Sequence, residues 1–189
     1  MNKEFTIELI TPMLGTVPKN QEIYTDFIAT KNPNGIDNDE IQTVEEIEEK
    51  GWTGFHSDTE GIFVYDYFIK GFLKNAGNVL KEELKIKAMR SKISDYAFVM
   101  PRKIYIAKNV DGVIERPLRA QTAQGPRVAL ARSDFVKEGT QIKFSIELLS
   151  HKEITWEVIN RLFEYGQLQG LGQFRNGGYG RFKVVVKYS

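Results

Sequence analysis

Three segments of the chain alternate apolar and polar residues with the period of a strand that is buried on one side. They span residues 4–10, 140–149 and 181–189, and the first places Phe5 and Ile7 on the same face. A strand of this kind has one face in a core and the other open to water or to a ligand. The pattern therefore predicts a sheet with one open face.

Two other segments have the apolar spacing of amphipathic helices. Residues 66–83 gather apolar side chains on one side and lysines on the other. Residues 150–166 begin with Ser150 and Glu153 in capping-box spacing and end at Gly166. Both segments are predicted to pack one face against the sheet.

The region between the two helices is rich in β-forming residues. Within residues 98–132, an Asp111-Gly112 pair flanked by strand-like sequence is typical of a hairpin turn. The elements then follow in the order strand, helix, strand, strand, helix, strand, which is the order of the ferredoxin-like fold. The sequence predicts an α+β protein with a βαββαβ antiparallel sheet and its helices on one face.

An acidic segment interrupts this order between the first strand and the first helix. From Asp37 to Glu60 the sequence has nine acidic residues and one basic residue. We expect residues 32–61 to form an insertion, containing a short helix and then a loop or hairpin, within a single domain of residues 1–189. Such a charge run suits a solvated surface, a docking face for a basic partner, or a mimic of nucleic acid.

The composition excludes several classes of protein. The chain has no cysteine, which rules out disulfides, cysteine nucleophiles and thiolate metal sites. Its most apolar-looking stretches, such as residues 62–69, are far shorter than the roughly 20 residues of a membrane-spanning helix. The N-terminal residues lack the apolar core of a signal peptide, so a cytoplasmic location is expected. No cofactor is expected, and no set of residues has the spacing of metal ligands.

Basic residues concentrate in two windows of the sequence. Residues 70–92 and residues 101–132 each contain seven basic and two acidic residues. A solvated helical face explains the first window as well as ligand binding does. The second window is dominated by arginine, whose planar guanidinium matches the geometry of phosphate. It predicts contact with an anionic ligand.

Five glycines occur in the segment GLGQFRNGGYGRF, residues 170–182, just before the last strand. Glycine allows positive φ angles and lets another backbone approach closely, which an ordinary connection does not need five times. The segment is either a turn packed against the sheet or a loop that holds an anionic ligand. A nucleotide-binding loop fits poorly, because no Walker lysine follows and the glycines precede a strand.

This loop resembles the GxGxxxxGxxG signature of the RAMP superfamily of CRISPR-associated RNA-binding proteins. Two further stretches agree with the resemblance. ELITPMLGT, residues 8–16, is similar to the first strand and following loop of RAMP backbone subunits, and YFIKGFLKNAG, residues 67–77, is similar to their first helix. As a whole the chain looks most like RAMP-type proteins carried by phages and prophages.

The resemblance implies that RNA crosses the open face of the sheet and that the glycine-rich loop contacts the RNA backbone. Main-chain N–H groups and arginines would hold phosphates, and an aromatic ring could stack on an unpaired base. The residues expected to bind single-stranded RNA or DNA are Lys70, Lys74, Arg116, Arg119, Arg127, Arg132, Gly172, Phe174, Arg175, Asn176, Gly178, Tyr179 and Arg181.

Catalytic residues have a weaker signal. Some RAMP proteins cleave RNA with a histidine base, and His56 and His151 are the two histidines here. We expect His151 to be a solvated residue in the first turn of its helix, and His56 has acidic neighbours that would repel phosphate. Asp26 could correspond to the metal-binding aspartate of backbone-type subunits, but its surroundings differ and a helix surface is the simpler interpretation.

We therefore expect a non-catalytic RAMP-type protein that binds single-stranded nucleic acid, preferably RNA. One alternative is a metal-independent endoribonuclease that uses His56. The other is a phage-encoded interaction protein whose acidic insertion engages host defence proteins. For the non-catalytic RAMP-type protein, further RAMP-type subunits are expected as partners.

Overall fold

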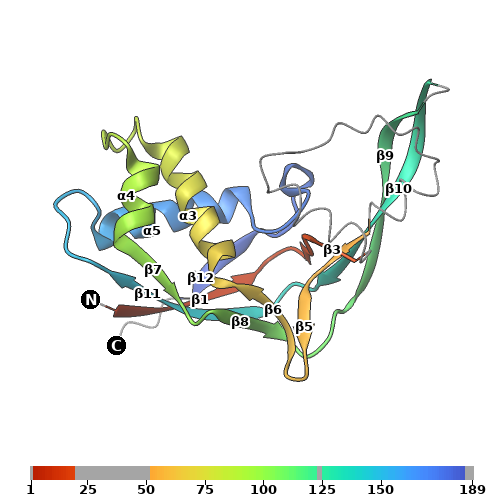
Figure 1. The fold of residues 1–189 in the computed structure, drawn as a ribbon, viewed down its shortest axis with the longest axis horizontal. Coiled ribbons are helices and arrows are strands. Elements are labelled where there is room, and N and C mark those ends of the chain that lie inside the picture. The colour runs from red at the N-terminus through yellow and green to blue at the C-terminus, as the bar shows by residue number, and fades with distance from the viewer. Residues whose placement is uncertain (1, 20–51, 123–124, 186–189) are drawn as a thin grey trace, which may run out of the picture.

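A four-stranded antiparallel sheet is the centre of the fold (Figure 1). The computed structural model describes residues 2–19, 52–122 and 125–185, with only the backbone for residues 118–122 and 125–129. The sheet consists of β1 (Asn2–Leu9), β7 (Ala97–Met100), β11 (Gln141–Leu148) and β12 (Phe182–Val185), in the spatial order β12-β1-β11-β7. The first and last strands are therefore neighbours, as in a ferredoxin-like sheet.

Helices cover one face of this sheet. Helix α3 (Asp66–Leu80) is followed by the shorter α4 (Met89–Tyr96), which leads into β7. Helix α5 (Trp156–Gln169) lies between β11 and β12 in the chain. The apolar positions of β1 and β11 pack against buried helix residues such as Ile69 and Phe163. The α+β ferredoxin-like fold is confirmed. No helix in the described ranges is long and apolar enough to cross a bilayer.

The start and end predicted for α5 are wrong. The Nδ1 atom of His151 accepts hydrogen bonds from the N–H groups of Glu153 and Ile154, at 3.0 and 3.1 Å, and so closes a separate turn before the helix. The Glu153 carboxylate pairs with Lys92 at 2.6 Å and does not complete a capping box. At the other end Gly166 lies inside the helix, where a side chain would overlap the Phe72 ring.

A second, three-stranded sheet lies beside β11 of the central sheet (Figure 1). It pairs β5 (His56–Asp58) with β6 (Gly61–Tyr65) and β6 with β8 (Lys103–Ala107), all antiparallel. The hairpin predicted at Asp111-Gly112 is wrong, because β8 pairs with β6 and not with the strand that follows. Instead, the Asp111 carboxylate accepts a hydrogen bond from the Lys137 N–H at 3.0 Å.

The long hairpin of the protein lies further along the chain. Its strands are β9 (Gly112–Thr122) and β10 (Gly125–Val136), and it extends away from the rest of the molecule (Figure 1). At its root, β10 also pairs with β2 (Met13–Leu14) and β4 (Thr53–Gly54). The hairpin root is thereby joined to the segment that follows β1.

The structure holds the two ends of segment 20–51 together. Strand β3 (Val17–Pro18) pairs with β4, and the Lys19 N–H donates to the Trp52 carbonyl at 3.0 Å. The Lys19 ammonium and the Trp52 indole N–H both bind the buried carboxylate of Asp134 on β10. Residues 32–51 of the expected insertion, and with them the test of its predicted short helix, lie outside the described residues, as does Asp26. Residues 52–61 contribute β4 and β5.

Candidate nucleic-acid interface

The glycine-rich loop lies on the segment that follows β1. The Gly180 N–H donates to the Pro12 carbonyl at 2.8 Å, and the Gln173 N–H donates to the Leu14 carbonyl at 3.3 Å. The Thr11 hydroxyl donates to the Gly178 carbonyl and accepts from the Arg181 N–H, both at 2.9 Å. The loop backbone is thus fixed by the protein itself.

Four of the five glycines in the loop have a packing reason. Gly170, Gly172 and Gly180 have φ angles between 72° and 82°, and a Cβ at any of them would lie against a backbone carbonyl of Tyr179, Leu14 or Leu171. A Cβ at Gly177 would overlap the Phe174 ring.

Gly178 is different from the other four. Its φ is +85°, but nothing lies within 4 Å of the place that a Cβ would occupy. Of the five, Gly178 alone has open space beside it for another molecule. Of the two glycines expected to bind nucleic acid, Gly172 therefore packs against Leu14 within the protein, and Gly178 has open space beside it.

Phe174 is the exposed aromatic residue of the loop. Its φ of +52° is uncommon for a bulky residue, and half of the residue's surface is exposed. The Arg116 guanidinium lies over the ring at 4.8 Å, and the Tyr179 ring lies 5.9 Å away. A strained backbone that presents an aromatic ring to solvent is typical of a functional position.

Arg116 joins the hairpin root to the loop. Its Nη2 atom donates to the Ser133 hydroxyl at 2.8 Å and to the Gln173 side-chain oxygen at 3.2 Å. The same oxygen accepts from the hydroxyls of Thr53, at 2.8 Å, and Ser133, at 2.9 Å. Thr53 and Ser133 are both buried. Residues from β4, β9, β10 and the loop therefore meet in one polar network.

The charge of Arg116 is not neutralised within the described part of the chain. Its partners are neutral oxygens and an aromatic ring, its Nε is buried without a partner there, and burial lowers its pKa. Arg175 and Arg181 likewise form no ion pair with the described residues. By contrast, carboxylates neutralise three other arginines: Asp66 pairs with Arg102, Glu115 with Arg132, and Glu83 with Arg161. We call Arg116, Phe174, Arg175, Tyr179 and Arg181 the loop–hairpin junction.

The other expected binding residues have varied surroundings. The Lys70 ammonium donates to the carbonyls of Ser94 and Ala97 at the end of α4, so these contacts account for it without a ligand. Arg132 is held by Glu115 and lies over Trp52.

The remaining expected residues are placed only by their burial or their backbone. Lys74 is half-buried on α3, and Asn176 is exposed in the loop. Arg119 and Arg127 lie on β9 and β10, but their side chains are outside the described part.

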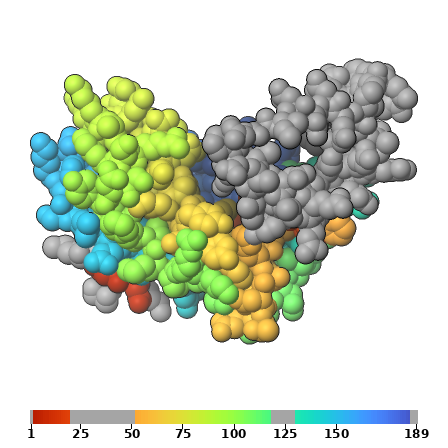
Figure 2. Space-filling model, in the orientation of Figure 1, coloured from red at the N-terminus to blue at the C-terminus, as the bar shows by residue number. Residues whose placement is uncertain are grey.

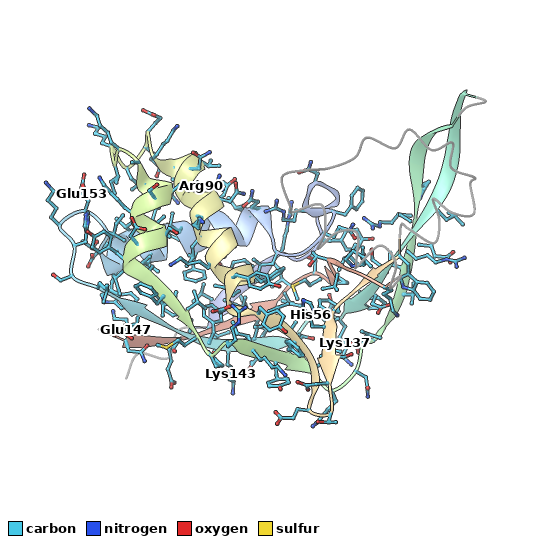
Figure 3. All side chains as sticks on the ribbon, viewed as in Figure 1. His56, Arg90, Lys137, Lys143, Glu147 and Glu153 are labelled. Atoms are coloured by element: carbon cyan, nitrogen blue, oxygen red, sulfur yellow. The ribbon has the colours of Figure 1, made fainter. Side chains whose placement is uncertain are left out.

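The two histidines lie away from the junction. His56 packs against Phe63 and Tyr65, with ring centroids 5.6 and 4.8 Å away, and burial lowers its pKa. Figure 3 places it on the β5 side of the molecule, away from the glycine-rich loop. His151 closes the turn before α5. In the described ranges, no group of three or more acidic or histidine side chains could hold a metal ion.

The open face of the central sheet has mixed charge. Glu4 and Glu147 are exposed there together with Lys143, which Figure 3 shows on the side opposite the helices. Lys183 pairs with Glu8 at 2.6 Å. Among the described residues, this face therefore offers no cluster of unpaired cations to a phosphate backbone, whereas the loop–hairpin junction does.

Comparison with solved structures supports the fold. One chain of a complex described as type III-B Cmr-beta bound to cognate target RNA matches with a TM-score of 0.55 at 12% identity, covering 98% of this chain. This chain spans only 58% of the length of that one. A chain of a type IV-B CRISPR complex matches with a TM-score of 0.49 at 8% identity, covering 100% of this chain and 93% of the other. No family model and no curated protein matches the sequence. The likeness to the Cmr-beta chain shows a shared fold.

Proposed function

We propose that the chain binds single-stranded RNA at the loop–hairpin junction, as a non-catalytic protein of the RAMP type. The observation that carries this proposal is the Arg116 guanidinium, which has no counter-charge among the described residues, beside an exposed, strained Phe174. A partly buried cation is costly without a counter-charge. A phosphate would supply that charge, and an adjacent base could stack on the ring.

The surroundings of the junction fit an extended strand of nucleic acid. Arg175 begins a 3-10 turn in the middle of the loop, and Arg181 directly precedes β12. Neither has a described carboxylate partner, so both are available to phosphates. Gly178 between them leaves room for a backbone to approach. Stacking on an aromatic ring requires an unpaired base, which favours a single strand over a duplex. The likeness to a chain from an RNA-bound complex makes RNA the first ligand to test.

The proposal is tested by the salt dependence of oligonucleotide binding. We expect the affinity for single-stranded RNA to fall with salt, with a log–log slope of about −0.7 for each phosphate neutralised. Arg175→Ala and Arg181→Ala should each weaken binding by about 1–3 kcal/mol and flatten that slope. Filter-binding titrations over a range of salt concentrations measure both quantities, and single-stranded DNA of the same sequence tests the preference for RNA.

Lys143→Ala is the matched control, since it removes one charge from the open face of the sheet. It should leave the affinity almost unchanged. If Lys143→Ala weakens binding as much as the loop variants do, RNA crosses the open sheet face instead. A wild-type protein that binds no oligonucleotide at low salt contradicts the proposal altogether.

One observation keeps the endoribonuclease alternative in view. Burial lowers the pKa of His56, which favours the neutral imidazole, the form that can accept a proton. The His56 ring packs against Phe63 and Tyr65 and is not one of the junction residues, so we expect no cleavage by the wild type. Loss of a measured RNA-cleaving activity in His56→Ala would establish the alternative. A phage origin rests on the sequence resemblance alone, and a role against host defence proteins rests on the acidic segment 37–60. Further RAMP-type subunits are proposed as partners from the resemblance and from the likeness to a chain of the Cmr-beta complex.

A further inference from the structure

The three-stranded sheet has an unusual outer face. Ile62, Val64 and Ile104 point into the main core. The residues that alternate with them point outward, where polar side chains are normal. Here that outer side carries aromatic rings, and the first turn of α3 adds one more. We call this surface the aromatic face; its rings are those of His56, Phe63, Tyr65, Tyr67 and Tyr105.

The rings form one continuous array. Phe63 lies 5.7 Å from Tyr105 and 5.2 Å from Tyr65, and Tyr65 lies 5.3 Å from Tyr67. Phe63 is only 4% exposed although it is on the outer side of the sheet, because its neighbours cover it. At the two ends of the array, Tyr67 is 53% and Tyr105 36% exposed. Figure 2 shows β5, β6, β8 and the start of α3 side by side at the surface.

The charged groups around the aromatic face are paired with one another. Asp58 binds the Lys103 ammonium at 2.6 Å and the Tyr105 hydroxyl at 3.0 Å, which lowers the pKa of Asp58 to about 2. Arg102 is paired with Asp66, and its guanidinium lies over Tyr65 and Tyr67 at 4.8 and 5.4 Å. These pairs give the face little net charge, in contrast to the loop–hairpin junction.

We propose that the aromatic face is a second binding site, which stacks unpaired nucleobases. The inference rests on the proposed function for the supply of a single strand, but the site is separate from the junction. Tyr67 and Tyr105 would each offer a ring. Arg102, whose side chain is 66% exposed, would add a planar cation that can stack on a base.

The chemistry of the face favours a base over a phosphate or a protein. Phosphates need unpaired cations, and both cations of the face are already held by carboxylates. Protein interfaces carry about one hydrogen bond for every 100–200 Å². On the aromatic face, the charged groups and the Tyr105 hydroxyl already bind one another, so they are not available for hydrogen bonds to a protein partner. A planar, uncharged ring requires only the stacking surface that remains.

The test compares two probes of equal length: an oligouridylate of ten nucleotides and a ten-unit abasic ribose-phosphate strand. Tyr67→Ala should weaken binding of the oligouridylate about 5- to 100-fold and leave the abasic strand unchanged. The loss should persist at high salt, because stacking is not screened. Tyr67→Phe keeps the ring and should bind like the wild type. Tyr105→Ala and Tyr105→Phe repeat the comparison at the other end of the array.

The possible outcomes separate this inference from the proposed function. Loop variants should weaken both probes, whereas aromatic-face variants should weaken only the probe that has bases. If Tyr67→Ala and Tyr105→Ala bind both probes like the wild type, the inference is wrong while the junction can still be right, and a protein partner becomes the better occupant. Equal losses for the two probes, or no base-dependent binding by the wild type, also overturn it.

Discussion

Replacing Gly180 with alanine should destabilise the protein by about 3 kcal/mol or more, whereas the same change at Gly178 should cost about 1–2 kcal/mol. Both glycines have a positive φ, of +72° and +85°, so both substitutions carry the strain of a left-handed backbone. Only at Gly180 does the new Cβ also overlap a backbone carbonyl, that of Leu171. Urea unfolding measures the free energy of unfolding of the two variants. Gly178→Ala reports the backbone strain alone, and Gly180→Ala reports the strain together with the overlap.

The same pair of positions tests the role of the loop in binding. Gly178→Asn should keep the fold, because asparagine tolerates the left-handed region better than other side chains. It should still weaken RNA binding if a strand passes close to the backbone there. Equal destabilisation by alanine at Gly178 and Gly180 would refute the packing account. Unchanged RNA binding by a folded Gly178→Asn protein would show that the strand does not approach this point.

Changing Gln173 to glutamate should stabilise the protein and reduce its affinity for RNA. The new carboxylate would lie where the Gln173 oxygen now accepts from Arg116 at 3.2 Å, and it would neutralise that guanidinium inside the network. A hydrogen bond between charged groups is stronger than a neutral one, so we expect about 1 kcal/mol of added stability. With Arg116 neutralised, RNA affinity at low salt should fall about tenfold and the salt slope should flatten by about 0.7.

Asn160→Asp is the control for this experiment, because it makes the same amide-to-carboxylate change on the exposed side of α5. It should change the RNA affinity only slightly. Thermal melts and salt titrations of the two variants separate a local effect on Arg116 from a general effect of added negative charge. If Gln173→Glu binds RNA as tightly as the wild type, Arg116 does not contact the ligand.

The parts of the fold that follow from local periodicity were predictable. The strands at 4–10 and 140–149 and the helix at 66–83 were placed within a few residues, because their apolar spacing is set by burial on one face. The pairing of β8 was not predictable in this way. An Asp-Gly pair favours a tight turn, but the core positions of Ile104 and Ile106 bring β8 beside β6 instead. Tertiary packing decided that partner.

The candidate site was predictable only in part. The loop sequence drew attention to Phe174 and to the arginines, but it could not show that most glycines serve internal packing, since that depends on contacts with Leu14 and Phe174 itself. Thr53, Ser133 and Gln173 carried no signal, because nothing local links residues so far apart in the chain. The aromatic face could have been noticed, since Phe63 and Tyr65 occupy alternate positions where a half-exposed strand normally has polar residues.

The pairing of β3 with β4 makes residues 19 and 52 neighbours, joined by one backbone hydrogen bond. The entropy of closing a loop grows only with the logarithm of its length, so the chain between two such neighbours can lengthen, shorten or be exchanged at little cost in folding free energy. The chain between residues 19 and 52 is therefore a site where insertions and replacements should be tolerated. One segment can replace another there during evolution, and a reporter or a tethering peptide can be inserted in the laboratory. The ferredoxin-like fold should stay the same in both cases.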